Sequence, residues 1–183
     1  VQHASRIFSQ SFELIHHTPS DGMPVDMPAS FLFAGFSWHD NAYKMWKIEM
    51  DREGRRFPLT EVTEPYAFIG TEAALPDAEA RLKQLLQQRG KTSAELDMEP
   101  FEVLRDIVRS ARYDDIGGVP QMAKVFRHMT THFYATLWPC ADGRIRPHAF
   151  GRPQNGWEHT SWAMFDPDTL HFNAPRPPDP PDA

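Results

Sequence analysis

Two histidines stand four residues apart in the segment His128-Met129-Thr130-Thr131-His132. On a helix this spacing places both imidazoles on one side, where they can bind a metal ion. The surrounding residues predict a strand end and a turn instead, and the segment contains no Glu. We therefore expect no metal site here, and we expect no cofactor in this chain.

The residue types of a hydrolytic triad occur together in Ser37-Trp38-His39-Asp40. Neighbouring side chains on an extended segment point to opposite faces, so they cannot line up as nucleophile, base and orienting acid. We interpret the segment as a surface loop. The only cysteine, Cys140, excludes an internal disulfide, and no basic residue stands beside it in the sequence to activate the thiol. We expect Cys140 to be inert.

The glycine pair in Gly117-Gly118-Val119-Pro120-Gln121 lacks the lysine and the strand-to-helix context of a phosphate-binding loop. Glycine adopts positive φ without strain, so the pair is better explained as the point where the chain leaves a helix. A backbone turn is therefore predicted, not a nucleotide site.

Hydrophobic periodicity predicts the elements that carry these residues. Apolar residues at helical spacing predict a short helix at 7–15, and short apolar or alternating runs predict strands at 31–36, 43–50, 56–63 and 66–70. Two amphipathic helices follow at 78–86 and 101–111, and strands return at 121–128, 132–138, 144–150 and 161–165. The helices should be adjacent, antiparallel and packed on one sheet, with four buried residues: Leu82, Leu85, Leu104 and Ile107.

The order of strands, two helices and strands excludes a doubly wound parallel sheet and predicts an α+β fold with antiparallel sheets. The run 31–36 is apolar on both faces, which indicates layered sheets between helices. We expect one domain at 1–172. The segment 173–183 has five prolines and no apolar periodicity, which predicts a disordered tail.

The chain of 183 residues has 40% hydrophobic and 24% charged residues, an ordinary globular composition. The formal net charge is −6 and the basic residues are scattered, which argues against a nucleic-acid partner. No apolar run approaches the roughly 20 residues of a membrane span, and no signal sequence begins the chain. We expect a cytoplasmic protein without a membrane partner.

Several motifs then follow one another in a known order: 31–37, the alternating strand 43–50 with an acidic turn and Gly54, and Phe68-Ile69-Gly70-Thr71 leading into the first long helix. With the second helix and the Gly-Gly before a strand, this order resembles the proteasome β-subunit type of N-terminal nucleophile (Ntn) hydrolase. The resemblance covers 28–128 by motif and continues to about 165 by element order. It implies a four-layer αββα fold, hydrolysis of peptide or amide bonds, and assembly into rings, with an ATPase or regulatory protein as a possible partner.

The resemblance also implies site residues. Thr71 takes the place of a hydroxyl residue after a glycine at a strand end, and Asp114 or Asp115 represents the acid near the Gly-Gly turn. Ile116 stands where the family has a supporting serine, and an aliphatic side chain cannot hydrogen-bond the terminal amine. Val1 cannot be the family's N-terminal Thr, Ser or Cys nucleophile, so we expect that group outside this chain. The alternative is a catalytically inactive scaffold or binding module of the same fold.

Association follows as a further expectation, because a layered fold without its first strands exposes sheet edges and apolar surface. All tryptophans stand in strand-rich parts, where burial on a sheet or at a subunit contact is expected. They are Trp38, Trp46, Trp138, Trp157 and Trp162. Together with Phe133, Tyr134 and Phe165, the last three of them indicate a homo-oligomer, either a dimer or a ring.

Overall fold

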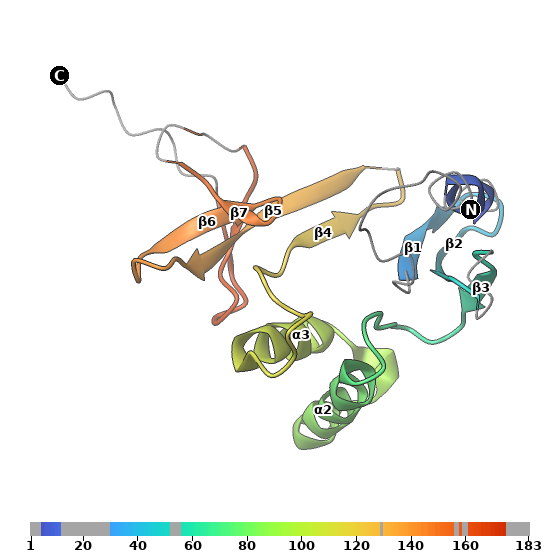
Figure 1. Cartoon of the computed structure of the whole chain (residues 1–183), viewed down its shortest axis with the longest axis horizontal. Coiled ribbons are helices and arrows are strands. Elements are labelled where there is room, and N and C mark those ends of the chain that lie inside the picture. Colours follow the sequence, from blue (N-terminus) through green and yellow to red (C-terminus); the bar gives the residue numbers. More distant parts are fainter. Residues whose placement is uncertain are drawn as a thin grey trace, which may run out of the picture. The chain divides into compact units, whose positions relative to one another are not determined.

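The computed structural model describes residues 5–11, 30–51, 56–128, 130–155, 158 and 161–174. The chain divides into two compact units, a first unit at Val1–Gly70 and a second unit at Thr71–Ala183. Strands and helices occur in the predicted order (Figure 1), which confirms the α+β class. Most of the predicted tail, from residue 175 onward, lies outside the described residues. Among the described helices, none is long and apolar enough to cross a membrane.

The first unit contains an antiparallel sheet of β1 (Ser30–Ser37), β2 (Ala42–Glu49) and β3 (Leu59–Val62), in that order. Ile48 lies at its centre, paired with Phe31 on one side and Leu59 on the other, and it is completely buried. Three predicted strands are therefore confirmed. The predicted strand at 66–70 is wrong: these residues pair with no strand in the described chain, and an apolar run without a partner forms no ladder.

A helical segment at 5–11 covers one face of this sheet. The Phe8 ring stacks on Phe31 with 4.3 Å between centroids, and it also meets the rings of Phe33 and Phe57. The hydroxyl of Ser9 accepts a hydrogen bond from the Phe57 amide at 3.2 Å. The helical segment thus covers the face of Phe31 and Phe33. Full burial of β1 on both faces was nevertheless a wrong expectation, because none of its eight residues is fully buried. The predicted helix residues beyond 11 lie outside the described part.

The second unit begins with α2 (Ala74–Arg89), the short 3₁₀ helix η1 (Ser93–Glu95) and α3 (Glu99–Ser110). Residues four apart form the buried face of α2, and Gly90 ends the helix at φ +63°. The buried positions Leu82 and Ile107 are confirmed, and Leu85 is half-buried. Leu104 was wrongly predicted to be buried and is 39% exposed. It stands one position beyond Val103 on the helix, outside the face that packs inward.

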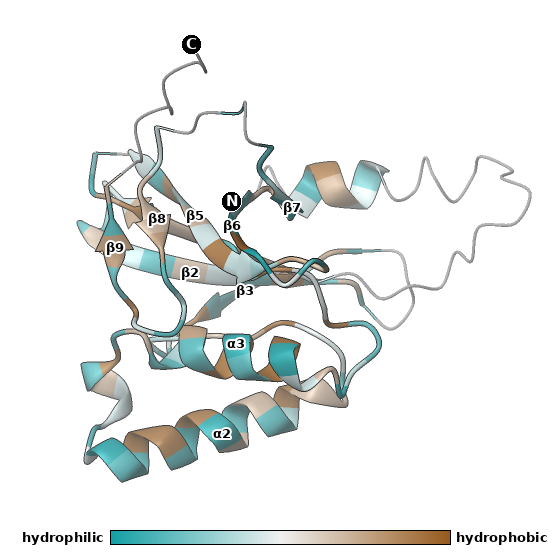
Figure 2. Ribbon diagram, turned by 90° about the vertical axis from the view of Figure 1, so that its left-hand side faces the viewer, coloured by the Kyte–Doolittle hydropathy of each residue, from teal (hydrophilic) through white to brown (hydrophobic). Residues whose placement is uncertain are grey.

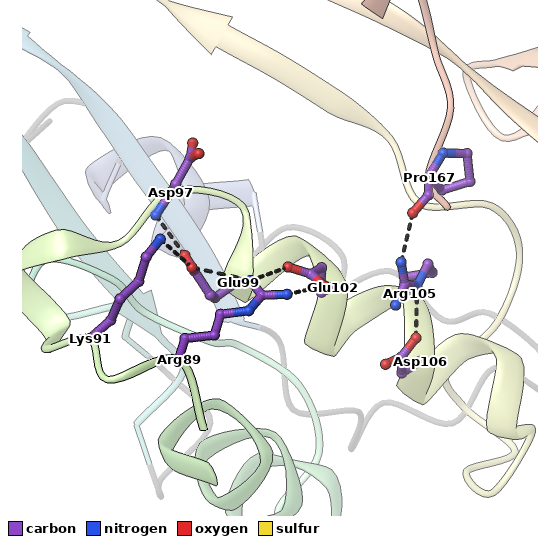
Figure 3. A network of polar contacts seen from close by, with 8 residues as sticks. All are labelled: Arg89, Lys91, Asp97, Glu99, Glu102, Arg105, Asp106 and Pro167. Atoms are coloured by element: carbon purple, nitrogen blue, oxygen red, sulfur yellow. Dashed lines mark hydrogen bonds and ion pairs between the residues drawn. The ribbon is translucent and has the colours of Figure 1, made fainter. Parts of the chain in front are cut away.

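Polar contacts at both ends show that α2 and α3 run antiparallel, as predicted. Arg89 at the end of α2 binds Glu102 near the start of α3 through two hydrogen bonds of 2.7 and 2.9 Å (Figure 3). At the opposite end, the hydroxyl of Tyr113 donates to Asp77 in the first turns of α2 at 3.1 Å. Polar contacts thus connect the two antiparallel helices at both of their ends.

Glu99 is the centre of the contacts drawn in Figure 3 and is only 1% exposed. Its carboxylate accepts hydrogen bonds from Lys91 at 2.7 Å, from the Asp97 amide at 2.7 Å and from Arg89 at 3.2 Å. Burial alone would raise the pKa of Glu99, but these donors outweigh it and lower the pKa to about 2. The carboxylate therefore fixes the start of α3 while charged.

The second unit then forms a six-stranded sheet in the order β7-β6-β5-β8-β9, with β4 also paired to β5. The sequence left two of these strands unpredicted, β7 and β9, which have two residues each. The expectation of antiparallel pairing throughout is also wrong, because β8 runs parallel to β5, with Ala135 opposite Met164. The strands are β4 (Met122–Val125), β5 (Thr131–Pro139), β6 (Ile145–Ala149), β7 (Arg152–Pro153), β8 (Met164–Phe165) and β9 (Phe172–Asn173).

Phe165 on β8 joins this sheet to α3. Its ring is fully buried and meets Phe101 of α3 edge-on at 4.8 Å and Phe172 of β9 at 4.9 Å. Arg105 of α3 donates to the carbonyl of Pro167 at 2.7 Å, in the turn that follows β8. Within this unit α3 lies between α2 and the strands (Figures 1 and 2). We expected both helices to pack on one sheet; α3 does so, whereas α2 packs on α3.

Candidate functional site

A hollow of about 420 Å³ lies in the second unit at the C-terminal end of α3. The last turn of α3, the loop that follows it and the end of β5 form its walls. The side chains relevant to its chemistry are Arg109, Tyr113, Asp114, Ile116 and Trp138. This hollow contains part of the motif on which the family resemblance was based, which makes it the candidate site.

The loop turns sharply because of its backbone. Ala111 ends α3 in the left-handed conformation at φ +46°, and its amide donates to the carbonyl of Val108. The Ile116 amide then donates to the carbonyl of Tyr113 at 3.2 Å, closing a turn. Gly118 follows at φ +81°, which confirms the positive φ predicted in the glycine pair, but the chain leaves the helix earlier, at Ala111. Asp114 and Ile116 are thereby held at the mouth of the hollow.

Tyr113 anchors the loop to α2. Burial raises the pKa of its hydroxyl, and the hydrogen bond that it donates to Asp77 raises the pKa further. Arg81 binds the same carboxylate at 3.1 Å, and this contact lowers the pKa of Asp77. The carboxylate of Asp77 is therefore charged at neutral pH. It contacts Arg81 within α2 and Tyr113 in the loop, and so connects the loop to the helix.

Arg109 and Trp138 form the wall opposite the loop. The Arg109 guanidinium lies over the indole of Trp138, 4.8 Å from its centroid, and the indole is 9% exposed. Both terminal nitrogens of Arg109 also bind the carboxylate of Asp168, and this pairing lowers the pKa of Asp168. Arg109 is thus paired with a carboxylate and covers the indole, so this wall carries little free positive charge.

The predicted site residues are only partly brought together. Asp114 lines the hollow, whereas Asp115 and Thr71 are exposed residues that do not. The carbonyl of Thr71 accepts the amides of Ala74 and Leu75 at 3.1 Å and so begins α2. Ile116 is half-buried in the wall, where it contributes apolar surface. The lining residues combine one carboxylate with apolar and aromatic groups, a composition suited to binding and lacking a nucleophile paired with a base.

Two sets of histidines lie elsewhere. His132 packs against the ring of Phe126 at 4.8 Å, and His128 precedes the turn into β5. In the exposed turn after β1, Ser37 donates to Asp40 at 2.8 Å and His39 lies 3.2 Å from the other carboxylate oxygen. The segment is thus the surface turn that we predicted. Ser37 and His39 both contact the acid, an arrangement that differs from a nucleophile hydrogen-bonded to its base.

The turn at Asp40 is held by charge. Hydrogen bonds from Ser37 and then His39, together with Lys44, lower the pKa of Asp40 to about 2. Lys44 reaches both Asp40 and Glu61 at 3.1 Å. The cluster is solvent-exposed and bridges the turn to β3, so it serves the local structure of the first sheet.

Sequence reasoning missed three residues of interest: Arg109, Trp138 as a wall of the hollow, and His148 as a neighbour of Cys140. The Cys140 Sγ lies 3.9 Å from Nε2 of His148, a neighbour in space that the adjacent sequence positions do not show. Asp142-Gly143 was recognised as a turn, and pairing the flanking strands as a hairpin would have brought His148 toward the cysteine. The position of Arg109 depends on tertiary contacts and had no such signal.

The chain matches no protein-family model, no curated protein and no solved structure.

Proposed function

We propose that this chain is a subunit of a proteasome-like Ntn hydrolase assembly that acts on peptide or amide bonds, with the nucleophile supplied from outside its 183 residues. One observation carries the proposal: Asp114, Ile116 and the glycine pair, which form the motif after the second helix, line a single hollow at the end of α3. The sequence of a β-meander, two antiparallel helices and a strand after Gly-Gly supports the same fold family. The four-layer αββα arrangement and a cytoplasmic location belong to this proposal.

In such a hydrolase the terminal amine serves as general base for its own hydroxyl or thiol, and backbone amides stabilise the oxyanion. The residues of this chain would have a supporting role. The exposed carboxylate of Asp114 can hold a protonated amine by a charge-assisted hydrogen bond. Ile116 adds apolar surface to the lining of the hollow, which suits an apolar side chain of a bound segment.

A second candidate function is a non-catalytic scaffold of the same fold. Ile116 favours it, since a half-buried aliphatic group in the wall cannot orient an amine or a water molecule. The position of Thr71 favours it too, because its hydroxyl lies outside the lining of the hollow. In this role the hollow would bind a segment of a neighbouring subunit and leave it uncleaved.

Both candidates require assembly, and we propose a homo-oligomer with an ATPase or regulatory protein as a possible further partner. Trp138 and Phe165 are buried in the second unit and are not available for contacts. Phe133 and Phe150 are 45% and 70% exposed, and both meet the ring of Trp162. This exposed aromatic cluster of Phe133, Phe150 and Trp162 is the surface that we assign to a subunit contact.

A peptidase assay distinguishes the two candidates. The 183-residue chain should not cleave fluorogenic peptides or react with a covalent inhibitor of N-terminal nucleophiles. The same protein extended by its encoded upstream residues, and processed to a terminal Thr, Ser or Cys, should do both if it is a hydrolase. Asp114→Asn should lower that turnover, with Asp115→Asn as the matched control. Turnover by the 183-residue chain that is lost in Ser37→Ala or Thr71→Ala would overturn the proposal.

A further inference from the structure

The turn between β5 and β6 brings the single thiol of the chain against a buried imidazole. Cys140 is half-exposed, and its Sγ lies 3.9 Å from Nε2 of His148. His148 is only 6% exposed, so its ring is held almost entirely inside the second unit. A partly buried thiol therefore faces a base that is largely protected from solvent.

The contact of the other ring nitrogen of His148, Nδ1, determines whether Nε2 can accept a proton from the thiol. Its Nδ1 lies 2.9 Å from the backbone carbonyl oxygen of Arg146. A carbonyl oxygen can only accept, so Nδ1 must carry the proton in this contact. In the neutral imidazole Nε2 is then the acceptor, and the Cys140 thiol donates its proton toward it. The Cys140 thiol thus contacts the imidazole of His148, and the carbonyl of Arg146 orients that imidazole, as in a nucleophile, base and orienting group.

The backbone keeps both partners in place. The Cys140 amide donates to the carbonyl of Arg144 at 2.8 Å, and the Cys140 carbonyl accepts the amide of Gly143 at 2.9 Å. Gly143 adopts φ +77°, a conformation that favours glycine. His148 is fixed opposite Thr136 by the pairing of β6 with β5. The contact therefore joins two residues of a closed hairpin.

We propose that Cys140 and His148 form a reactive thiol site that is modified by small disulfides of the glutathione disulfide class. His148 Nε2 takes the thiol proton, and the thiolate attacks one sulfur of the disulfide. A new disulfide forms between Cys140 and that sulfur while the original sulfur–sulfur bond breaks. The leaving thiolate receives the proton from the imidazolium, so one thiol is released for each thiol consumed. This site is independent of the hollow and of the proposed hydrolase function.

The rate of disulfide exchange tests this proposal on the full chain. Cys140 is the only cysteine, so an aromatic disulfide reagent that releases a coloured thiolate reports on this group alone. At neutral pH the folded chain should react about tenfold faster than the same chain unfolded in urea, because Nε2 of His148 lies where it can accept the thiol proton as Cys140 attacks the disulfide. With glutathione disulfide, mass spectrometry should find one adduct for each chain.

Two variants identify the base. His148→Gln should abolish the difference between the folded and the unfolded chain, whereas the matched control His171→Gln, at an exposed position of the same unit, should retain it. Circular dichroism establishes whether each variant is folded. If His148→Gln does not fold, the comparison within the unaltered chain is decisive by itself. A folded chain that reacts at the unfolded rate or slower, or a folded His148→Gln that keeps the full rate, would overturn the proposal.

Discussion

At the scale of single residues, Glu99 shows how a buried charge can position a helix. The carboxylate is nearly inaccessible to solvent, yet a lysine, an arginine and a backbone amide satisfy it. Removing the carboxylate would deprive the Asp97 amide and the partly exposed Lys91 and Arg89 of their shared acceptor. Because α3 begins at Glu99 and ends at the hollow, this contact also affects the candidate site.

The acid dependence of stability should reveal this carboxylate. Its pKa of about 2 lies below the ordinary value of 4.5, so its contribution to stability is complete above pH 4.5 and is lost as the pH falls toward 2. Glu99→Gln should therefore lower the free energy of unfolding by about 3 kcal/mol at neutral pH. It should also flatten the fall of the melting temperature below pH 4.5. Glu72→Gln, at an exposed position, is the control and should change neither quantity.

Residue types in the sequence were sufficient to find Asp114 and the glycine pair but not their surroundings. Both occur in one short motif, and the backbone of that motif forms the turn that it predicts. Arg109 of α3 and Trp138 of β5 are in contact although they belong to different elements, and no local spacing encodes such a contact. Cys140 and His148 were eight residues apart and still missed, because their contact depends on closing a hairpin.

At the scale of elements, α2 and α3 show what hydrophobic periodicity can predict and what it cannot. Both helices were found because each has apolar residues at a spacing of three or four. Ile107 was placed correctly on the buried face of α3, but Leu104 was chosen in place of its neighbour Val103. The buried face also contains Glu99 and Glu102, and a hydrophobic pattern cannot predict buried charges. The two-residue strands β7 and β9 were missed because they exist only through pairing with their neighbours.

Alanine substitutions in the two helices should differ strongly. Leu82→Ala removes a completely buried side chain and should cost about 2–5 kcal/mol of unfolding free energy. Leu104→Ala changes a residue of the same type that is 39% exposed, and it should cost less than about 1 kcal/mol. Urea denaturation measures both. Equal losses for the two variants would contradict the packing of α3 described above.

At the scale of the whole molecule, the exposed aromatic cluster of Phe133, Phe150 and Trp162 leads to a prediction about association of the chain. Light scattering should give a mass above the 21.0 kDa of one chain, that of a dimer at least. Phe150→Ser should return the mass to that of the monomer, because Phe150 is the most exposed ring of the cluster. Ile145→Ser, at the other end of β6 and 69% exposed, is the matched control. A mass of 21.0 kDa at all concentrations would show that this cluster does not mediate association.

The contact between α3 and β8 has a consequence for synthesis of the chain on the ribosome. Phe101 emerges early, but Phe165, the ring that packs on it, and Phe172, which packs on Phe165, emerge near the end of the described residues. Until then the Phe101 ring of α3 lacks its contact with Phe165. A nascent chain that stops at Ala149 would leave Phe101 open to water or to a chaperone. The second unit can therefore complete its folding only after translation has passed β9.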